Sequence, residues 1–263
     1  MKLDGCTALI TGASAGIGRE FARQLAGRAG SLVLVARRRD RLEELRAELA
    51  RSNPDVKVHI YTFDLSRMDQ MEELCAAVER DRIQLDLLIN NAGLGDRGDF
   101  VGAEPQRILD MLLVNVVALT ALTRRLLPGM IARKKGAVLN VSSCASFLPM
   151  ATMAVYAATK AYVTSFSEAI GAELRGTGVH VTALCPGPVH TEFASVAARG
   201  ADEDQQIAPG FTHVPVGDVV RDGIRGLEAA RPIVIPGFVM KLGMLLVRLT
   251  PMPVLRLASR VAT

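Results

Sequence analysis

A tyrosine and a lysine four residues apart are the side chains in this sequence best suited to moving a proton. They are the ends of Tyr-Ala-Ala-Thr-Lys at 156–160, within the segment Ser143–Lys160. If residues 156–175 form a helix, Tyr156 and Lys160 share one of its faces. A neighbouring ammonium favours phenolate, so this spacing predicts a tyrosine pKa below its usual value of about 10. Such a tyrosine can exchange a proton with a carbonyl or an alcohol. Ordinary helix surfaces carry the same spacing, so the chemistry needs support from the rest of the chain.

A glycine-rich segment near the N-terminus has the composition of a nucleotide-binding loop. Thr11–Gly18 reads Thr-Gly-Ala-Ser-Ala-Gly-Ile-Gly and lies between a strand-like run and a helical pattern. Glycines in this position allow a tight turn and let the backbone approach a pyrophosphate at the helix N-terminus. The loop therefore predicts a dinucleotide site, formed by Gly12, Ser14, Ala15, Gly16, Ile17 and Gly18.

The end of the second predicted strand indicates which dinucleotide is bound. A carboxylate there would bind the ribose of NAD, but Ala36 is followed by Arg37, Arg38 and Arg39. Guanidinium groups attract a 2′-phosphate, so NADP(H) is the expected cofactor, contacted by Arg37 and Arg38. In the alternative interpretation, the arginines only begin a solvated helix.

Strand-like and helical patterns alternate along the chain, which predicts a doubly wound α/β fold in one domain. Several strands are apolar on both faces, as in a parallel sheet covered by helices on both sides. The expected strands are 7–10, 31–36, 56–62, 85–89, 137–141, 179–184 and 233–235. The expected helices are 17–28, 39–51, 68–81, 105–133, 156–175 and 217–229.

These motifs together resemble the short-chain dehydrogenase/reductase superfamily from about residue 5 to 235. The resemblance rests on Thr11–Gly18, Asp64-Leu65, Asn90–Gly93, Asn115, Ser143, Tyr156 with Lys160, and Pro186-Gly187 with Thr191. It implies a Rossmann-type seven-stranded parallel sheet and nicotinamide-dependent oxidoreduction of carbonyls and alcohols. It also implies further cofactor contacts from Asp64, Leu65, Asn91, Ala92, Gly93, Pro186, Gly187, Val189 and Thr191, the last at the carboxamide.

The same resemblance assigns the catalytic roles. Tyr156 is the expected general acid and base, and Lys160 keeps its phenolate accessible and binds the nicotinamide ribose. Ser143 is expected to hydrogen-bond the substrate oxygen, and Asn115 to link Lys160 to solvent through water. A non-catalytic NADP-sensing or scaffold protein of the same fold would not need to keep all four residues. An NAD-dependent alcohol dehydrogenase is the other alternative.

Apolar residues near the expected site favour a hydrophobic ketone or alcohol as substrate. Candidate contacts are Leu94, Gly95, Phe147–Met153 and Pro188–Phe193, with a loop at about 186–216 expected to act as a lid. We expect the domain to span 1–236, followed by an extension at 237–263.

The extension has an unusual composition, because residues 231–263 contain five basic residues and no acidic one. Either it packs near the active site or on a partner subunit, or Phe238–Leu249 forms an amphipathic helix on an anionic membrane, giving peripheral contact through 238–260. Apolar faces on the helices at 105–133 and 156–175 favour a homodimer or homotetramer.

Composition argues against several other classes. The chain has a net charge of +4, no tryptophan and three tyrosines, so nucleic-acid binding is not expected. The four cysteines lack metal-ligand spacing, so we expect no metal and a reducing compartment. With no signal-peptide pattern and no charge-free apolar run of about 18 residues, the sequence favours a cytoplasmic protein without a membrane span.

Overall fold

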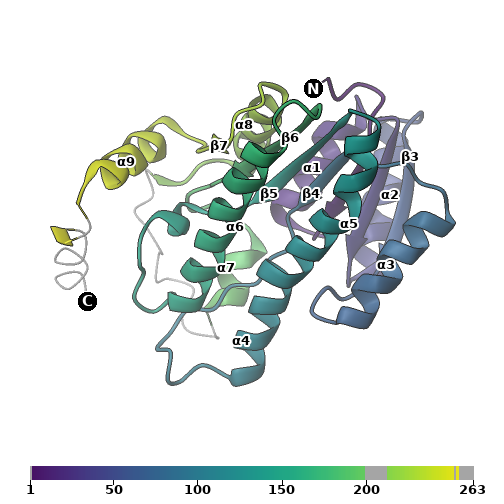
Figure 1. The fold of residues 1–263 in the computed structure, drawn as a ribbon. Coiled ribbons are helices and arrows are strands. Elements are labelled where there is room, and N and C mark those ends of the chain that lie inside the picture. The colour runs from purple at the N-terminus through teal and green to yellow at the C-terminus, as the bar shows by residue number, and fades with distance from the viewer. Residues whose placement is uncertain (1, 199–211, 252, 255–263) are drawn as a thin grey trace.

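A parallel β-sheet forms the centre of the molecule (Figure 1). The computed structural model describes residues 2–198, 212–251 and 253–254, and in these residues seven strands pair in the order β3-β2-β1-β4-β5-β6-β7. The strands are β1 (Thr7–Thr11), β2 (Ser31–Ala36), β3 (Lys57–Thr62), β4 (Leu87–Asn90), β5 (Gly136–Val141), β6 (Val179–Leu184) and β7 (Ile233–Val234). This is the Rossmann-type architecture that the sequence predicts.

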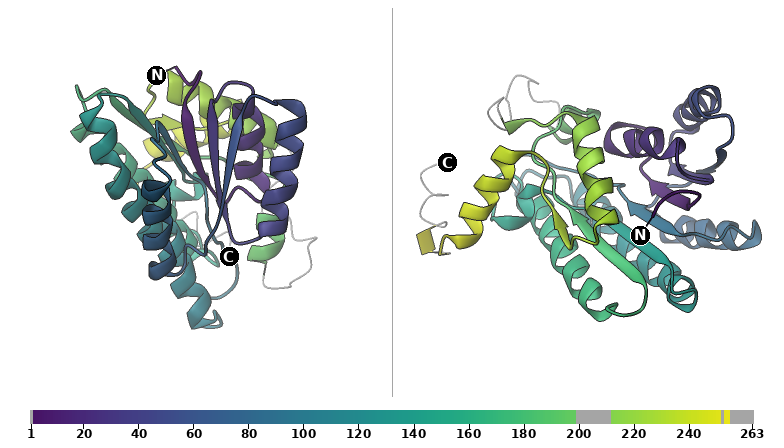
Figure 2. Two further views of the ribbon diagram at one scale, coloured as in Figure 1. Left: turned by 90° about the vertical axis from the view of Figure 1, so that its right-hand side faces the viewer. Right: turned by 90° about the horizontal axis from the view of Figure 1, so that it is seen from above.

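Helices cover both faces of the sheet (Figure 2). One face packs against α1 (Gly16–Ala26), α2 (Arg39–Ser52) and α8 (Val216–Glu228). The other packs against α3 (Met68–Arg80), the long helix made of α4 (Pro105–Leu112) and α5 (Leu119–Ala132), and α6 (Ala154–Glu173). Two short helices, the 3₁₀ turn Cys144–Phe147 and α7 (Glu192–Ala197), lie at the carboxyl end of the strands, and α9 (Phe238–Leu249) follows the sheet.

The apolar strands are explained by the two helical layers. Along β2, Leu32 and Leu34 belong to the core beneath α1 and α2, whereas Val33 and Val35 belong to the core on the opposite face. Successive side chains of a strand point to opposite faces, so a sheet covered on both sides needs apolar residues at every position.

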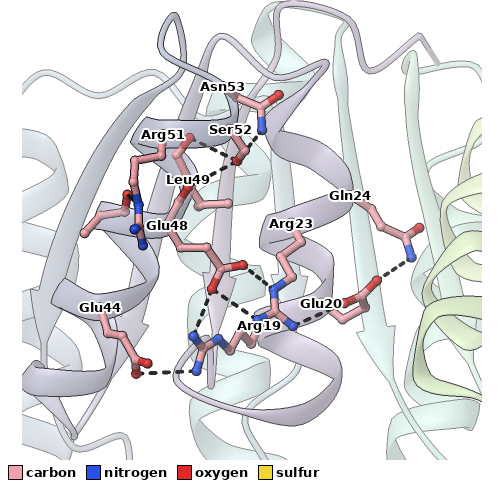
Figure 3. Close-up of polar contacts among 11 residues, drawn as sticks. Arg19, Glu20, Arg23, Gln24, Glu44, Glu48, Leu49, Arg51, Ser52 and Asn53 are labelled. Carbon is pink, nitrogen blue, oxygen red and sulfur yellow. Dashed lines mark hydrogen bonds and ion pairs between the residues drawn. The ribbon is translucent and has the colours of Figure 1, made fainter.

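Ion pairs fasten α2 to α1 (Figure 3). The carboxylate of Glu48 on α2 accepts hydrogen bonds from Arg19 at 2.9 Å and from Arg23 at 2.6 Å, both on α1. These contacts, led by the hydrogen bond from Arg23, lower the pKa of Glu48 to about 2. Because α1 begins in the glycine-rich loop and α2 begins next to Arg38, the ion pairs fix two parts of the expected cofactor site relative to each other.

The helix expected at 105–133 differs from the prediction in one respect. A π-helical turn at Leu113–Ala118 separates α4 from α5. By length and apolar composition alone, Pro105–Ala132 could cross a membrane, since an 18-residue window within it has a mean hydropathy of 1.4. Here it packs against β5 and α6, in the position of a core helix.

Candidate active site

The expected site residues meet at the carboxyl end of the sheet, where the strand order reverses between β1 and β4. The glycine-rich loop follows β1, Asn91–Gly93 follow β4, Ser143 follows β5, and Pro186-Gly187 follow β6. In open α/β sheets, ligands bind at this reversal because the loops on its two sides diverge and leave a crevice.

The glycine-rich loop packs closely against the end of β4. Gly12 has φ of 66°, and a Cβ there would lie 2.8 Å from Nδ2 of Asn91. The Asn91 amide donates to the carbonyl oxygen of Thr11 at 2.9 Å, and the Thr11 hydroxyl accepts from the backbone N–H groups of Asn91 and Ala92. Asn91 and Ala92 therefore fix the position of the glycine-rich loop by hydrogen bonds. The backbone of this loop, free of side chains at its glycines, can approach a pyrophosphate.

Thr191 lies on the opposite side of this loop. Gly16 has φ of 52°, and a Cβ there would lie 3.2 Å from Cγ2 of Thr191. Thr191 also caps α7, since its hydroxyl accepts a hydrogen bond from the backbone N–H of Phe193 at 3.4 Å. The predicted cofactor contacts that follow the first and sixth strands therefore pack directly against each other.

The arginines after β2 line the expected adenosine end of the crevice. Arg38 donates to the hydroxyl of Ser14 at 3.4 Å and to Glu192 at 3.0 Å. Arg37 instead lies 3.7 Å from Asp64, so these two predicted residues form an ion pair. Arg41, which the sequence analysis missed, donates to the same Glu192 at 3.1 Å. Its spacing of three from Arg38 at the start of a helix was the available signal.

Asn115 is buried in the π-helical turn with its amide fully used. Its Oδ1 accepts from the backbone N–H of Leu94 at 2.8 Å. Its Nδ2 donates to the carbonyl oxygen of Leu94 at 2.9 Å and to the Thr159 hydroxyl at 3.0 Å. A Cβ on Gly93 would lie 3.4 Å from both Asn115 Oδ1 and Lys160 Nζ, so these two polar groups flank the same glycine.

Tyr156 and Lys160 lie on adjacent turns of α6, as their spacing predicts, but both are buried. The ammonium of Lys160 donates to the carbonyl oxygen of Val141 at 2.8 Å and lies 5.8 Å from the centre of the Tyr156 ring. Burial lowers the pKa of Lys160 to about 8. Burial raises the pKa of Tyr156 to about 12, and the hydrogen bond with Ser143 opposes this only partly.

The sequence-based prediction of a lowered Tyr156 pKa is therefore wrong for this structure. The physical reason is that desolvation disfavours the phenolate more than the surrounding polar groups favour it. The lysine charge does not compensate, because the ammonium is directed to Val141 rather than to the phenol oxygen.

An apolar cluster surrounds the Tyr156 ring. Its members are Met111, Met153 and Tyr156, with Leu94, Ala145, Met150, Val155 and Phe193 packed against them. Phe193 lies with its ring centre 5.5 Å from that of Tyr156. A cavity of about 40 Å³ lies beside the cluster and shares Met111 and Val155 with it. Met111 was not among the expected substrate contacts, although it lies four residues before Asn115 on one helix.

The sequence pattern of the short chain dehydrogenase family matches residues 6–201 of this chain. The chain belongs to that family. Members of the family are oxidoreductases that act on alcohols and carbonyls, so the fold and the general reaction class predicted from the motifs are confirmed.

Among curated proteins, a very-long-chain 3-oxoacyl-CoA reductase from Phaeosphaeria nodorum is 35% identical over 75% of this chain and 59% of its own length. The chain thus spans about three fifths of that fungal relative. The NADP-dependent 3-hydroxy acid dehydrogenase YdfG from Escherichia coli is 35% identical over 74% of this chain and 77% of its own length.

Solved structures of similar proteins include complexes with either nicotinamide cofactor. A short-chain dehydrogenase from Sphingobium yanoikuyae in complex with NADPH is 33% identical, with a TM-score of 0.81 over 89% of this chain and 88% of its own. A short-chain dehydrogenase/reductase from Burkholderia phymatum in complex with NAD is 25% identical, with a TM-score of 0.80 over 93% of both chains. Both of these neighbours therefore bind a nicotinamide cofactor.

Proposed function

We propose that this protein is an NADP(H)-dependent reductase of hydrophobic ketones, with Asn115, Ser143, Tyr156 and Lys160 as its catalytic set. The observation that carries the proposal is the position of Tyr156. Its ring lies in an apolar cluster against Phe193, two residues after Thr191, and the phenol is within reach of Ser143. A substrate oxygen beside this phenol would face the cofactor crevice.

Tyr156 is protonated at neutral pH, as a proton donor in the reduction must be. When bound, the nicotinamide cofactor supplies the hydride that converts a ketone into an alkoxide. The phenol of Tyr156, with a pKa of about 12, holds its proton at neutral pH and donates it to that alkoxide oxygen. Ser143 hydrogen-bonds the same oxygen, and Lys160 would bind the nicotinamide ribose. In the reverse direction the Tyr156 phenolate accepts the proton of the alcohol.

Arg38 and Arg41 support NADP(H) over NAD(H). Arg38 lies beside Ser14 of the glycine-rich loop, and Arg41 shares the partner Glu192 with it, at the end where a 2′-phosphate would lie. The NADP-dependent dehydrogenase and the NADPH complex among the relatives are consistent with this choice. If NADH bound more tightly than NADPH in a calorimetric titration, the alternative of an NAD-dependent alcohol dehydrogenase would be preferred.

A 3-oxoacyl chain is the substrate class that we favour. The methionines and Phe193 around Tyr156 form an adaptable apolar lining, and one fungal relative is named as a reductase of very long 3-oxoacyl-CoA chains. Each added methylene buried in such a lining raises kcat/KM by at most about fourfold, from roughly 0.8 kcal/mol per methylene.

The test is to follow NADPH oxidation with 3-oxoacyl thioesters of increasing length and with small ketones as controls. We expect kcat/KM to rise with chain length until the site is filled. In Tyr156→Phe, kcat should fall by about 10²- to 10⁴-fold while NADPH affinity is kept. A flat response to chain length would contradict the substrate class, and near-normal turnover in Tyr156→Phe would contradict the proton-transfer role. If the wild-type protein bound NADPH but turned over none of these substrates, the cofactor-sensing alternative would be favoured.

We also propose a cytoplasmic homodimer or homotetramer. Leu109 and Leu112 on α4 and Tyr162 on α6 are exposed apolar side chains on helices that lie side by side. Sedimentation of the protein as a monomer at micromolar concentration would contradict this.

Peripheral contact with a membrane through 238–260 is a further proposal. It is supported by the exposure of α9. Of this range, residues 252 and 255–260 lie outside the described part of the chain.

A further inference from the structure

Glu192 joins the two arginines at the expected adenosine end of the crevice. One carboxylate oxygen accepts from Arg38 at 3.0 Å, and the other accepts from Arg41 at 3.1 Å. These contacts bridge the start of α2 and the start of α7, which lie more than 150 residues apart in the sequence. A single carboxylate, that of Glu192, therefore binds both guanidinium groups at this end of the crevice.

We propose that Glu192 is an internal competitor of the cofactor's 2′-phosphate, and that it sets how strongly the protein distinguishes NADPH from NADH. This inference rests on the proposed NADP(H) function. A carboxylate and a phosphate are recognised by guanidinium groups through the same paired N–H···O geometry. A 2′-phosphate can use both guanidinium groups fully only when Glu192 has left them.

Charge opposes the joint presence of phosphate and carboxylate. The hydrogen bond and the positive charge of Arg38, followed by the charge of Arg41, lower the pKa of Glu192, so its carboxylate is ionised at neutral pH. A phosphate monoester carries about −1.5 to −2 charges at pH 7 and would be repelled by it. Arg38 and Arg41 are 45% and 39% exposed, so a ligand can reach them from solvent.

The neighbours of Glu192 in the sequence link the replacement of its carboxylate by a 2′-phosphate to the end of the crevice that contains Tyr156. Thr191 before it packs on Gly16, and Phe193 after it lies against the Tyr156 ring. NADH has no 2′-phosphate and leaves the carboxylate in place. NADPH displaces it and thereby releases the start of α7 from α2. The two cofactors should therefore differ in affinity and also in how firmly α7 is held.

The decisive variant is Glu192→Gln, which keeps the shape of the side chain and removes its charge. Exposed ion pairs of this kind contribute up to about 1 kcal/mol, so we expect NADPH to bind up to about fivefold more tightly, measured by calorimetry at low salt. NADH affinity should not change. Glu43→Gln is the matched control, because Glu43 lies on α2 but pairs with Arg39 and Arg46. It removes the same charge nearby without touching Arg38 or Arg41.

Two further measurements separate this inference from its alternatives. Arg41→Gln should weaken NADPH binding and leave NADH binding unchanged. The gain in Glu192→Gln should shrink at 1 M salt, where charges are screened within about 3 Å. Weaker or unchanged NADPH binding in Glu192→Gln would overturn the competitor role, as would Arg41→Gln with normal NADPH affinity. A wild-type protein that binds neither cofactor would instead refute the proposed function.

Discussion

Lys160 is a lysine inside the protein, 5% exposed, whose ammonium donates to the carbonyl oxygen of Val141 at 2.8 Å. Burial lowers its pKa from 10.5 to about 8. The unfolded chain therefore binds this proton more tightly than the folded protein does. The free energy of unfolding carries a penalty, on the order of 3 kcal/mol, below pH 8, and the penalty fades as the pH rises from 8 toward 10.5.

Lys160→Met should reveal this penalty. It removes the titrating group, so the wild type should gain about 2 kcal/mol relative to the variant between pH 7 and pH 9.5. Urea denaturation of both proteins at the two pH values measures this difference. Exposed Lys57, replaced by Met, is the control and should show a difference that does not vary with pH. If the difference in free energy of unfolding between the wild type and Lys160→Met were also the same at both pH values, burial would not lower the pKa of Lys160.

At this scale, sequence reasoning could predict which side chains surround the site but not their protonation. The types and spacing of Ser143, Tyr156 and Lys160 are visible in the sequence. Their pKa values depend on how far the packed sheet and helices exclude water, which spacing does not reveal. Glu192 shows the same limit, because nothing in its local sequence indicates two arginine partners at the start of a distant helix.

The π-helical turn Leu113–Ala118 is the element that positions Asn115. One extra residue in a helical turn changes the direction of the side chains that follow, and such turns are frequent at functional sites. Hydrophobic periodicity predicted the helix over 105–133 but could not show the turn, because the apolar pattern continues through it. The same periodicity gave the other long helices to within a few residues, since each has one face on the sheet.

Asn115→Leu should destabilise the protein through the backbone that Asn115 holds. The N–H and the carbonyl of Leu94 would both lose their side-chain partner, along with the Thr159 hydroxyl. Buried groups left unsatisfied cost about 1 to 3 kcal/mol each, so urea denaturation should show a loss of at least about 2 kcal/mol. The exposed pair Gln106–Asp110 on α4 provides the control, Gln106→Leu, with little expected change. Equal stability of both variants would mean that the turn does not depend on Asn115.

For the whole molecule, the seven-stranded parallel sheet and its two helical layers followed from the sequence, whereas the part around the substrate did not. Alternating strands and helices allow few arrangements once the sheet is parallel and covered on both faces. The segment 186–216 does not show this alternation of strand and helix patterns. It contains α7, which the sequence analysis did not predict, and residues 199–211 of the expected lid lie outside the described part of the chain.

Helix α9 presents two different faces to its surroundings. Met240, Gly243, Met244 and Val247, spaced as one helix face, are half-buried toward the body of the protein. Met240 packs on Gly187, and Arg248 lies over the ring of Phe147, so α9 sits beside the expected substrate entrance. The outer side exposes six large apolar side chains: Phe238, Val239, Leu242, Leu245, Leu246 and Leu249. Figure 1 and the right-hand view of Figure 2 show this helix at the edge of the molecule.

An anionic lipid surface fits that outer face better than a second copy of the chain. In a two-fold contact between α9 helices, the basic residues Lys241 and Arg248 would be brought near the same basic residues of the copy, and residues 231–263 offer no acidic partner. Headgroups of anionic lipids supply the missing charge, and the interface accepts the apolar face. An entrance beside this helix would then receive substrates that partition into the membrane.

We therefore predict that the full-length protein floats with vesicles containing phosphatidylglycerol and floats less with vesicles of phosphatidylcholine alone. The double variant Leu242→Glu/Leu246→Glu should lose most of this flotation while keeping its activity on short, soluble ketones. Its control is Val101→Glu, at an apolar side chain that is 96% exposed in the loop between β4 and α4. Equal flotation of the two variants would exclude α9 as the contact. If the wild type stayed with the unbound fraction at low salt, the alternative packing of α9 against a partner subunit would be preferred, because six apolar side chains still require a cover.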